Sequence, residues 1–128
     1  MKIEHAAYQV EDPVAVAEWY VKHLGLRVKR SQSERPFGYF LADDGDGVMI
    51  EIYNNPKASV PDYKSLDPLL LHLAFYTEDI AGTRARLIAA GATAVGEIAT
   101  NDVGDKLAML RDPWGFAIQF VTRTTRMI

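Results

Sequence analysis

Short stretches of the chain alternate between apolar and polar residues, and two of these stretches resemble each other. Residues 3–12 align with residues 70–79, which places His5 on His72. Alternation with a period of two is typical of a strand that is buried on one face. Both stretches end in Glu-Asp, and an aspartate at this place suits the N-cap of a following helix. The repeat indicates two similar units, each opening with a strand that leads into a helix.

The remaining pattern predicts the same order of elements in both halves of the chain. In the first half we expect a helix from Asp12 to about Leu24 and strands over 2–10, 26–29, 38–42 and 48–53. In the second half we expect a helix from Asp79 to about Ala90 and strands over 72–76, 93–98, 106–110 and 116–122. A glycine follows each predicted helix and suits the left-handed residue that commonly ends one.

We therefore predict an α+β fold of two tandem βαβββ modules, which form curved mixed sheets with helices on the outer face. One domain should hold module one (1–54), a connector (55–68), module two (69–123) and a tail (124–128). The connector is proline-rich and lacks periodicity, and the end of the chain from Arg123 is expected to fray. Modules of about 60 residues bury little core alone, so the two should pack as a pair, in one chain or through a dimer.

Composition narrows the classes of function. The 128-residue chain is 48% hydrophobic and 24% charged, and its net charge of -3 gives no reason to expect nucleic acid or an anionic membrane as a partner. It has no cysteine, which excludes disulfides and thiolate chemistry. It shows no signal-peptide pattern and no apolar run of about 20 residues. We expect a cytoplasmic protein that acts on a small molecule.

Polar side chains interrupt the apolar strands at matching places in the two halves. Glu51 lies between Ile50 and Ile52, and if the isoleucines face a helix, Glu51 faces the concave side of the sheet. The same alternation applies to the other members of the set, which is His5, Glu51, His72 and Gln119. Two imidazoles, one carboxylate and one amide oxygen suit a divalent metal such as Zn, Ni, Co, Mn or Fe. The alternatives are hydrogen-bonded core histidines, a solvated glutamate and a glutamine that only lines a cavity.

Other residues share a strand face with these positions or lie at a strand end, and they are candidate walls of a substrate-binding cavity. They are Ala7, Gln9, Met49, Tyr53, Tyr76 and Trp114. A cluster of basic residues before and in the first long loop has two interpretations, a solvated edge or a site for an anionic substrate tail. The cluster is Arg27, Lys29, Arg30 and Arg35.

These motifs resemble the vicinal oxygen chelate superfamily, which groups glyoxalase I, bleomycin and fosfomycin resistance proteins, extradiol dioxygenases and methylmalonyl-CoA epimerase. The resemblance runs from Ile3 to Val121. It rests on His5 and the stretch 48–52 in the first unit, and on His72 and the stretch 112–119 in the second. The Asp-Pro-x-Gly turn at the start of the last stretch is a frequent mark of the superfamily.

The resemblance implies that His5, Glu51, His72 and Gln119 hold a metal, which chelates two neighbouring oxygens of the substrate. Many relatives have glutamate where this chain has Gln119. An amide cannot accept a proton at working pH, which leaves Glu51 as the catalytic base. The change should weaken affinity for a divalent cation and make bound water more acidic. The nearest named chemistry is a lyase or isomerase reaction on a thiol adduct of a 2-oxoaldehyde, although no residue specifically demands glutathione.

Two other functions stay open at this stage. Some superfamily members are non-catalytic proteins that sequester a small molecule, often as dimers, and can lack the metal. Ring-cleaving dioxygenases use iron, and His5, His72 and Glu51 resemble the facial triad of non-haem iron enzymes. The resemblance also implies a homodimer, in which a site forms either within one chain or from one half of each of two chains.

Overall fold

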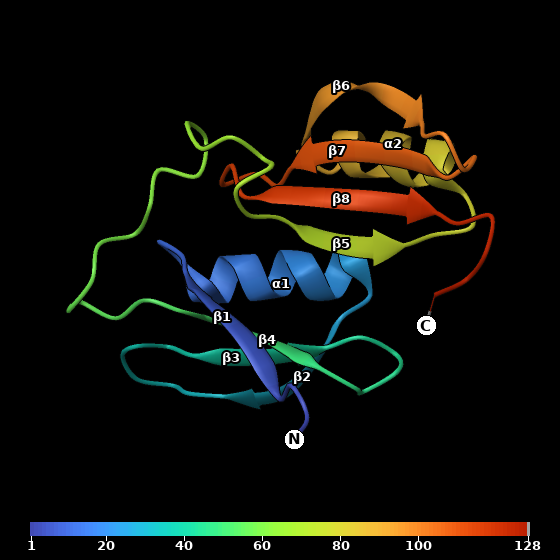
Figure 1. Cartoon of the computed structure of the whole chain (residues 1–128). Coiled ribbons are helices and arrows are strands. Elements are labelled where there is room, and N and C mark those ends of the chain that lie inside the picture. Colours follow the sequence, from blue (N-terminus) through green and yellow to red (C-terminus); the bar gives the residue numbers. More distant parts are fainter. Residues whose placement is uncertain (128) are drawn as a thin grey trace. The chain divides into compact units, whose positions relative to one another are not determined.

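The chain forms two compact units, which the computed structural model describes over residues 1–127 (Figure 1). Unit 1 spans Met1–Pro61 and unit 2 begins at Asp62. Unit 1 contains β1 (His5–Gln9), α1 (Pro13–Leu24), β2 (Arg27–Ser31), β3 (Tyr39–Ala42) and β4 (Met49–Tyr53). Unit 2 contains β5 (Leu73–Tyr76), α2 (Ile80–Ala89), β6 (Thr93–Thr100), β7 (Lys106–Arg111) and β8 (Ala117–Thr122). The predicted βαβββ order is confirmed in both units.

Each unit has one four-stranded mixed sheet. The strand order is β1-β4-β3-β2 in unit 1 and β5-β8-β7-β6 in unit 2. The first strand of each unit pairs in parallel with the last, and the other neighbours are antiparallel. Among residues 1–127, no helix is both long and apolar enough to cross a bilayer.

Some predicted strand boundaries are wrong, and strand pairing explains the differences. β1 begins at His5 rather than at Lys2, and β5 begins directly after His72. β2 continues to Ser31 because a bulge between Val28 and Arg30 lets the strand pair further along β3. β6 likewise continues through an irregular stretch as far as Thr100. Bulges interrupt the period of two, so the sequence pattern alone ended both strands too early.

Both helices begin and end as predicted, because their signals are local. The Asp12 carboxylate accepts a hydrogen bond from the Ala15 backbone N–H (3.0 Å), and Pro13 occupies the first turn. Asp79 does the same for α2 through the Gly82 N–H (2.9 Å). Gly25 adopts the left-handed conformation that ends α1.

The packing of α1 decides which face of the first sheet is left for a site. The helix buries Val16, Ala17 and Tyr20, and it packs on β2, β3 and β4. Tyr8 points toward it, since the Tyr8 hydroxyl donates to the Tyr20 hydroxyl at 3.0 Å. Side chains of β1 with the opposite parity, which include His5, therefore lie on the face away from α1. In unit 2, α2 covers one face of its own sheet in the same way.

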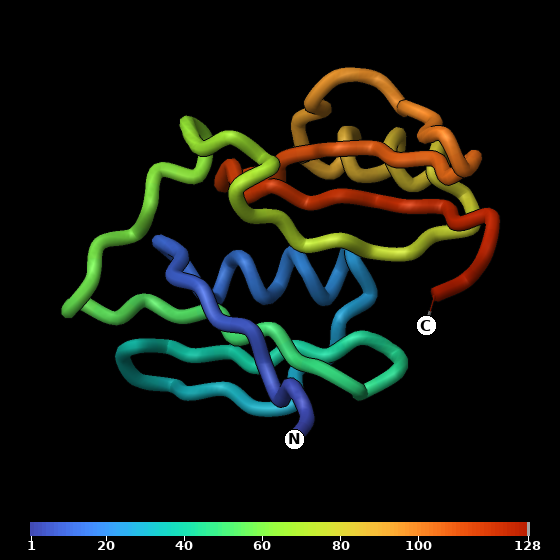
Figure 2. Tube along the Cα trace, in the orientation of Figure 1, coloured from blue at the N-terminus to red at the C-terminus, as the bar shows by residue number. Residues whose placement is uncertain are grey.

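The predicted connector is divided between the two units (Figure 2, green). Its first part joins unit 1, because the Gln9 amide donates to the carbonyl of Ala58 and accepts from the Asn55 N–H. Its second part joins unit 2. The Arg111 guanidinium donates to the carbonyls of Tyr63 and Leu66, both at 2.7 Å. The connector is thus held to the strand ends of both units.

The end of the chain is anchored at Asp105, so the predicted fraying is wrong for Arg123 and Thr124. The Asp105 carboxylate accepts hydrogen bonds from the Thr124 backbone N–H (2.9 Å) and from Arg123 Nη1 (2.8 Å). Asn101 also lies at hydrogen-bond distance. These donors, with the Thr124 backbone N–H first among them, lower the pKa of Asp105 to about 2.

This anchor should make the stability of the protein depend on pH in the acid range. The folded-state pKa of Asp105 lies below its ordinary value of 3.8, so its stabilising contribution is complete above about pH 4 and is lost as the pH falls toward 2. We expect the urea midpoint to fall more between pH 5 and pH 3 in the wild type than in Asp105→Asn. Equal pH dependence in the two proteins would contradict this assignment.

Candidate functional site

The first pair of predicted ligands meets on the face of unit 1 that lies away from α1. His5 Nε2 is 3.3 Å from Glu51 Oε2. The imidazole also stands edge-on to the Phe40 ring, with centroids 5.4 Å apart and the planes at 90°. His5 comes from the first residue of β1, and Glu51 from the middle of the neighbouring β4. One imidazole nitrogen and one carboxylate oxygen are therefore already positioned to share a cation.

His5 has a second carboxylate partner that the sequence did not point to. Its Nδ1 forms a hydrogen bond with the Glu4 carboxylate. That hydrogen bond raises the pKa of His5, partial burial opposes the rise, and the charges of Glu4 and Glu51 add to it. Alternation would place neighbours on opposite faces, but Glu4 precedes the first residue of β1 and is not bound by that rule. A carboxylate on Nδ1 fixes the ring so that Nε2 faces Glu51.

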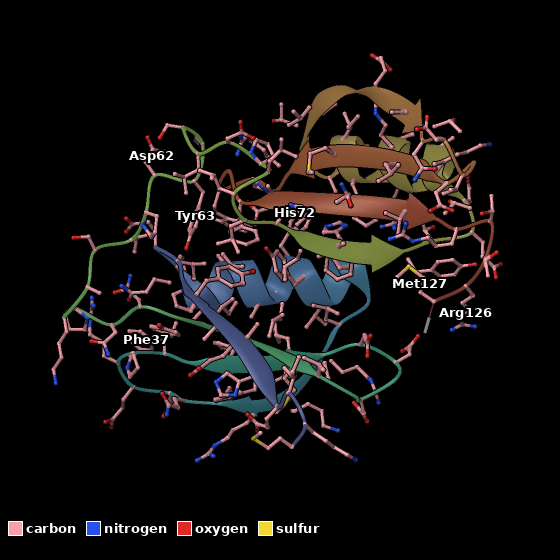
Figure 3. All side chains as sticks on the ribbon, in the orientation of Figure 1. Phe37, Asp62, Tyr63, His72, Arg126 and Met127 are labelled. Atoms are coloured by element: carbon pink, nitrogen blue, oxygen red, sulfur yellow. The ribbon has the colours of Figure 1, made fainter. Side chains whose placement is uncertain are left out.

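The second pair lies in unit 2. His72 stands just before β5 and is half-buried (Figure 3). Its Nδ1 lies 2.8 Å from the Pro68 carbonyl oxygen, so this nitrogen carries the proton and donates. The lone pair of Nε2 is then available to a metal. Gln119 is half-buried in the middle of β8.

Strand register shows that the two pairs occupy equivalent places. Ala7 pairs with Glu51 in the first sheet, and Ala74 pairs with Gln119 in the second. Each histidine stands two residues before that alanine. Across residues 1–127, no three His, Asp or Glu side chains are grouped so as to hold a metal ion. Each unit by itself thus presents one histidine and one further predicted ligand, which is Glu51 in unit 1 and Gln119 in unit 2.

The residues that were predicted to line a substrate cavity differ in their burial and in their contacts. Ala7, Met49 and Tyr53 share the face of His5 and Glu51, as their register shows. Gln9 is buried, and its amide is occupied by the connector. Tyr76 is 46% exposed, with the Arg126 guanidinium 5.6 Å from its ring centroid.

Trp114 lies in the Asp-Pro-x-Gly turn that leads into β8. Its backbone N–H donates to the Asp112 carboxylate at 3.0 Å, and the Phe116 N–H donates to the same oxygen at 2.9 Å. Gly115 has φ of +95°, a conformation that glycine adopts without strain. The turn therefore fixes the start of the strand that carries Gln119.

A comparison with models of protein families tests the resemblance that the sequence motifs suggested. The model of the glyoxalase/bleomycin resistance protein/dioxygenase superfamily matches residues 2–120. The chain belongs to this superfamily. The predicted resemblance is confirmed, and the match includes both histidines, Glu51 and Gln119. A search of curated proteins found no match.

Solved structures of proteins of similar length have the same fold. SMU.1112c is 30% identical, with a TM-score of 0.73 over 94% of this chain and 98% of its own. A glyoxalase family protein from Bacillus cereus is 18% identical, with a TM-score of 0.80 over 95% and 93%. TnmS3, an antibiotic binding protein from a Streptomyces species, is 20% identical, with a TM-score of 0.72 over 97% of both chains. At the two lower identities the likeness concerns the fold alone.

Proposed function

We propose that this protein is a divalent-metal-dependent, glyoxalase-like lyase or isomerase that acts on a small substrate chelated through adjacent oxygens. The observation that carries the proposal is the pairing of His5 Nε2 with Glu51 Oε2 at 3.3 Å, at a place that the repeat fills with His72 and Gln119 in unit 2. Superfamily membership supports it, because the superfamily includes glyoxalases.

The donor atoms fit a first-row divalent metal. His5 and His72 would each supply Nε2, because both Nδ1 atoms are engaged, by Glu4 and by the Pro68 carbonyl. Glu51 and Gln119 would supply oxygens. A metal such as Zn, Ni, Co, Mn or Fe supplies Lewis-acid polarisation of substrate oxygens when bound. Since each unit would contribute two of the four ligands, we propose that a complete site uses unit 1 and unit 2 of one chain or of two chains in a homodimer.

Glu51 would perform the proton transfer in this proposal. It is the one carboxylate among the four proposed ligands, and its side chain is 24% exposed. A partly buried carboxylate beside an imidazole can take a proton from a carbon next to a polarised carbonyl. Gln119 would orient and bind without moving a proton, because its amide has no basic site at working pH.

The test is metal-dependent proton exchange on a small compound with adjacent oxygens. Hydroxyacetone in D₂O, followed by ¹H NMR, should lose its methylene signal faster with protein loaded with zinc, nickel or cobalt than with metal-free protein. Glu51→Gln should abolish the acceleration while Glu18→Gln, a change of equal charge at an exposed position of α1, keeps it. Acceleration that survives in Glu51→Gln would contradict the role of Glu51.

The second candidate function is the binding of a small molecule without catalysis. Gln119 favours this function, because an amide at this position leaves Glu51 as the single carboxylate among the four proposed ligands and should weaken metal binding. Such a protein would bind its ligand equally well after metal removal. An iron-dependent ring-cleaving dioxygenase would instead consume oxygen with ferrous iron, which separates it from both. Sedimentation of the purified protein tests the proposed homodimer.

The amide at position 119 gives a direct prediction for metal affinity. Gln119→Glu should tighten zinc binding by about tenfold, because it adds a second carboxylate and makes the site one charge more negative. Gln119→Ala should weaken it only if the amide is a ligand. Competition with a chromophoric chelator measures both affinities. Unchanged affinity in both variants would remove Gln119 from the ligand set.

A further inference from the structure

The bulge in β2 turns an arginine onto the face that carries His5 and Glu51. Arg30 pairs with Phe40 across β2 and β3, and Phe40 pairs with Glu51 across β3 and β4. Paired residues point to the same face of a sheet, so these three side chains form one row. The backbone of Arg30 lies two strand spacings, or about 10 Å, from that of Glu51. Without the bulge between Val28 and Arg30, strand alternation would turn Arg30 to the opposite face.

Arg30 differs from Arg27, Lys29 and Arg35 because none of residues 1–127 is a partner of its side chain. Arg27 and Lys29 both pair with Asp46, at 2.9 and 3.2 Å. Arg35 donates to Asn54 Oδ1 at 3.1 Å and lies over the Phe37 ring. Within residues 1–127, the Arg30 guanidinium has no hydrogen-bond or ion-pair partner, and the residue is exposed. It is therefore the cation of this cluster that an anion can bind without breaking an existing pair.

A polar hollow lies at the loop that follows Arg30 in the sequence. It has a volume of about 410 Å³, opens to solvent and is lined by residues 31–36, directly after Arg30. Gly38 lies close both to a residue of the hollow, Gln32, and to Glu51. A Cβ atom at Gly38 would lie 3.2 Å from Gln32 Oε1 and 3.8 Å from Glu51 Oε1. The Gln32 amide and the Glu51 carboxylate thus both lie next to Gly38.

The equivalent row of unit 2 is apolar beyond the ligand position. Met109 pairs with Gln119 as Phe40 pairs with Glu51, and Val95 pairs with Met109 as Arg30 pairs with Phe40. The repeat therefore does not require a cation at this place for folding. Of these two equivalent rows, the one in unit 1, which contains Glu51, carries a positive charge and the one in unit 2 does not.

We propose that Arg30 binds an anionic group of the substrate, a carboxylate by preference, and selects for acids among compounds with adjacent oxygens. The inference rests on the proposed function, since it places the chelated end of the substrate near Glu51. The Arg30 guanidinium would then donate a charge-assisted hydrogen bond to the far end, across the Phe40 ring. Arg30 is a specificity residue here and takes no part in proton transfer.

The test compares two probes of nearly equal shape and different charge. Protocatechuate is a catechol that carries a carboxylate, and protocatechuamide is its neutral amide. Calorimetry with the zinc-loaded protein should show that the acid binds about tenfold more tightly than the amide. Arg30→Gln should remove this preference and leave the affinity for the amide unchanged. Lys22→Gln, which makes the same change of charge on α1, should keep it.

A second measurement separates the failure of this inference from the failure of the metal site. In metal-free protein, the acid should shift the NMR signal of Arg30 Nε–H, and the amide should not. Equal binding of both probes by the zinc-loaded wild type, or an equal preference in Arg30→Gln, would overturn the role of Arg30 and leave the metal site standing. If neither probe binds the zinc-loaded protein, the proposed function falls, and the Arg30 signal alone decides the anion site.

Discussion

Replacing His5 with alanine should weaken zinc binding by about a hundredfold or more. The substitution removes a nitrogen ligand and leaves Glu51 without the partner that lies 3.3 Å away. Loss of groups that only orient a ligand costs about tenfold to a hundredfold in metal affinity, so loss of a ligand should cost at least the upper value. Competition against a chromophoric chelator measures the change. By the equivalence of the two units, His72→Ala should have an effect of similar size.

The chain provides a matched control for both variants. His23 is the remaining histidine of the chain and is not a proposed ligand. It lies on α1, where its ring contacts the Trp19 ring at a centroid distance of 5.2 Å. His23→Ala should keep the affinity of the wild type. An equal loss in all three variants would indicate binding to scattered histidines, and an unchanged His5→Ala would exclude His5 as a ligand.

Replacing Asp112 with alanine should have the largest effect on stability, about 3 kcal/mol, because two hydrogen bonds to a buried carboxylate are lost together. Asp112 is buried, and a single oxygen accepts from the N–H groups of Trp114 and Phe116. Alanine would leave both N–H groups without that acceptor in a turn that has little access to water. Urea unfolding followed by circular dichroism measures the change in the free energy of unfolding.

The conservative variant Asp112→Asn separates the hydrogen bonds from the charge. The asparagine side chain keeps an oxygen that both N–H groups can reach, so it should recover at least half of the lost stability. Because the turn fixes the start of β8, unfolding of the Asp112→Ala variant should also release this strand, which carries Gln119. A loss below about 0.5 kcal/mol in Asp112→Ala, the size typical of surface substitutions, would show that the turn does not depend on this carboxylate.

The features that the sequence predicted well are those set by neighbouring residues. Asp12 and Pro13 specify the start of α1, and Gly25 specifies its end, without help from the rest of the fold. The repeat of His5 by His72 predicted equivalent strand positions, and the pairing of Ala7 with Glu51 and of Ala74 with Gln119 confirms that equivalence.

The features that the sequence did not predict depend on partners far along the chain. The bulge before Arg30 follows from pairing with β3, so its effect on the direction of Arg30 was not visible in the alternation. The hydrogen bonds from Arg111 to the connector join residues that are nearly 50 positions apart. Asp105 and Thr124 form the anchor of the tail by the same kind of long-range contact. Hydrophobic periodicity carries no signal for such polar contacts.

The most direct test of the proposed metal site is elemental analysis of the wild-type protein, purified without exposure to chelators. The proposal predicts close to one equivalent of zinc, nickel, cobalt, manganese or iron per complete set of His5, Glu51, His72 and Gln119. It also predicts that the metal is lost in the double variant His5→Ala/His72→Ala and retained in His23→Ala. A wild-type protein that holds no metal, even after reconstitution with each of these ions, would contradict the catalytic proposal and leave the small-molecule binding function in its place.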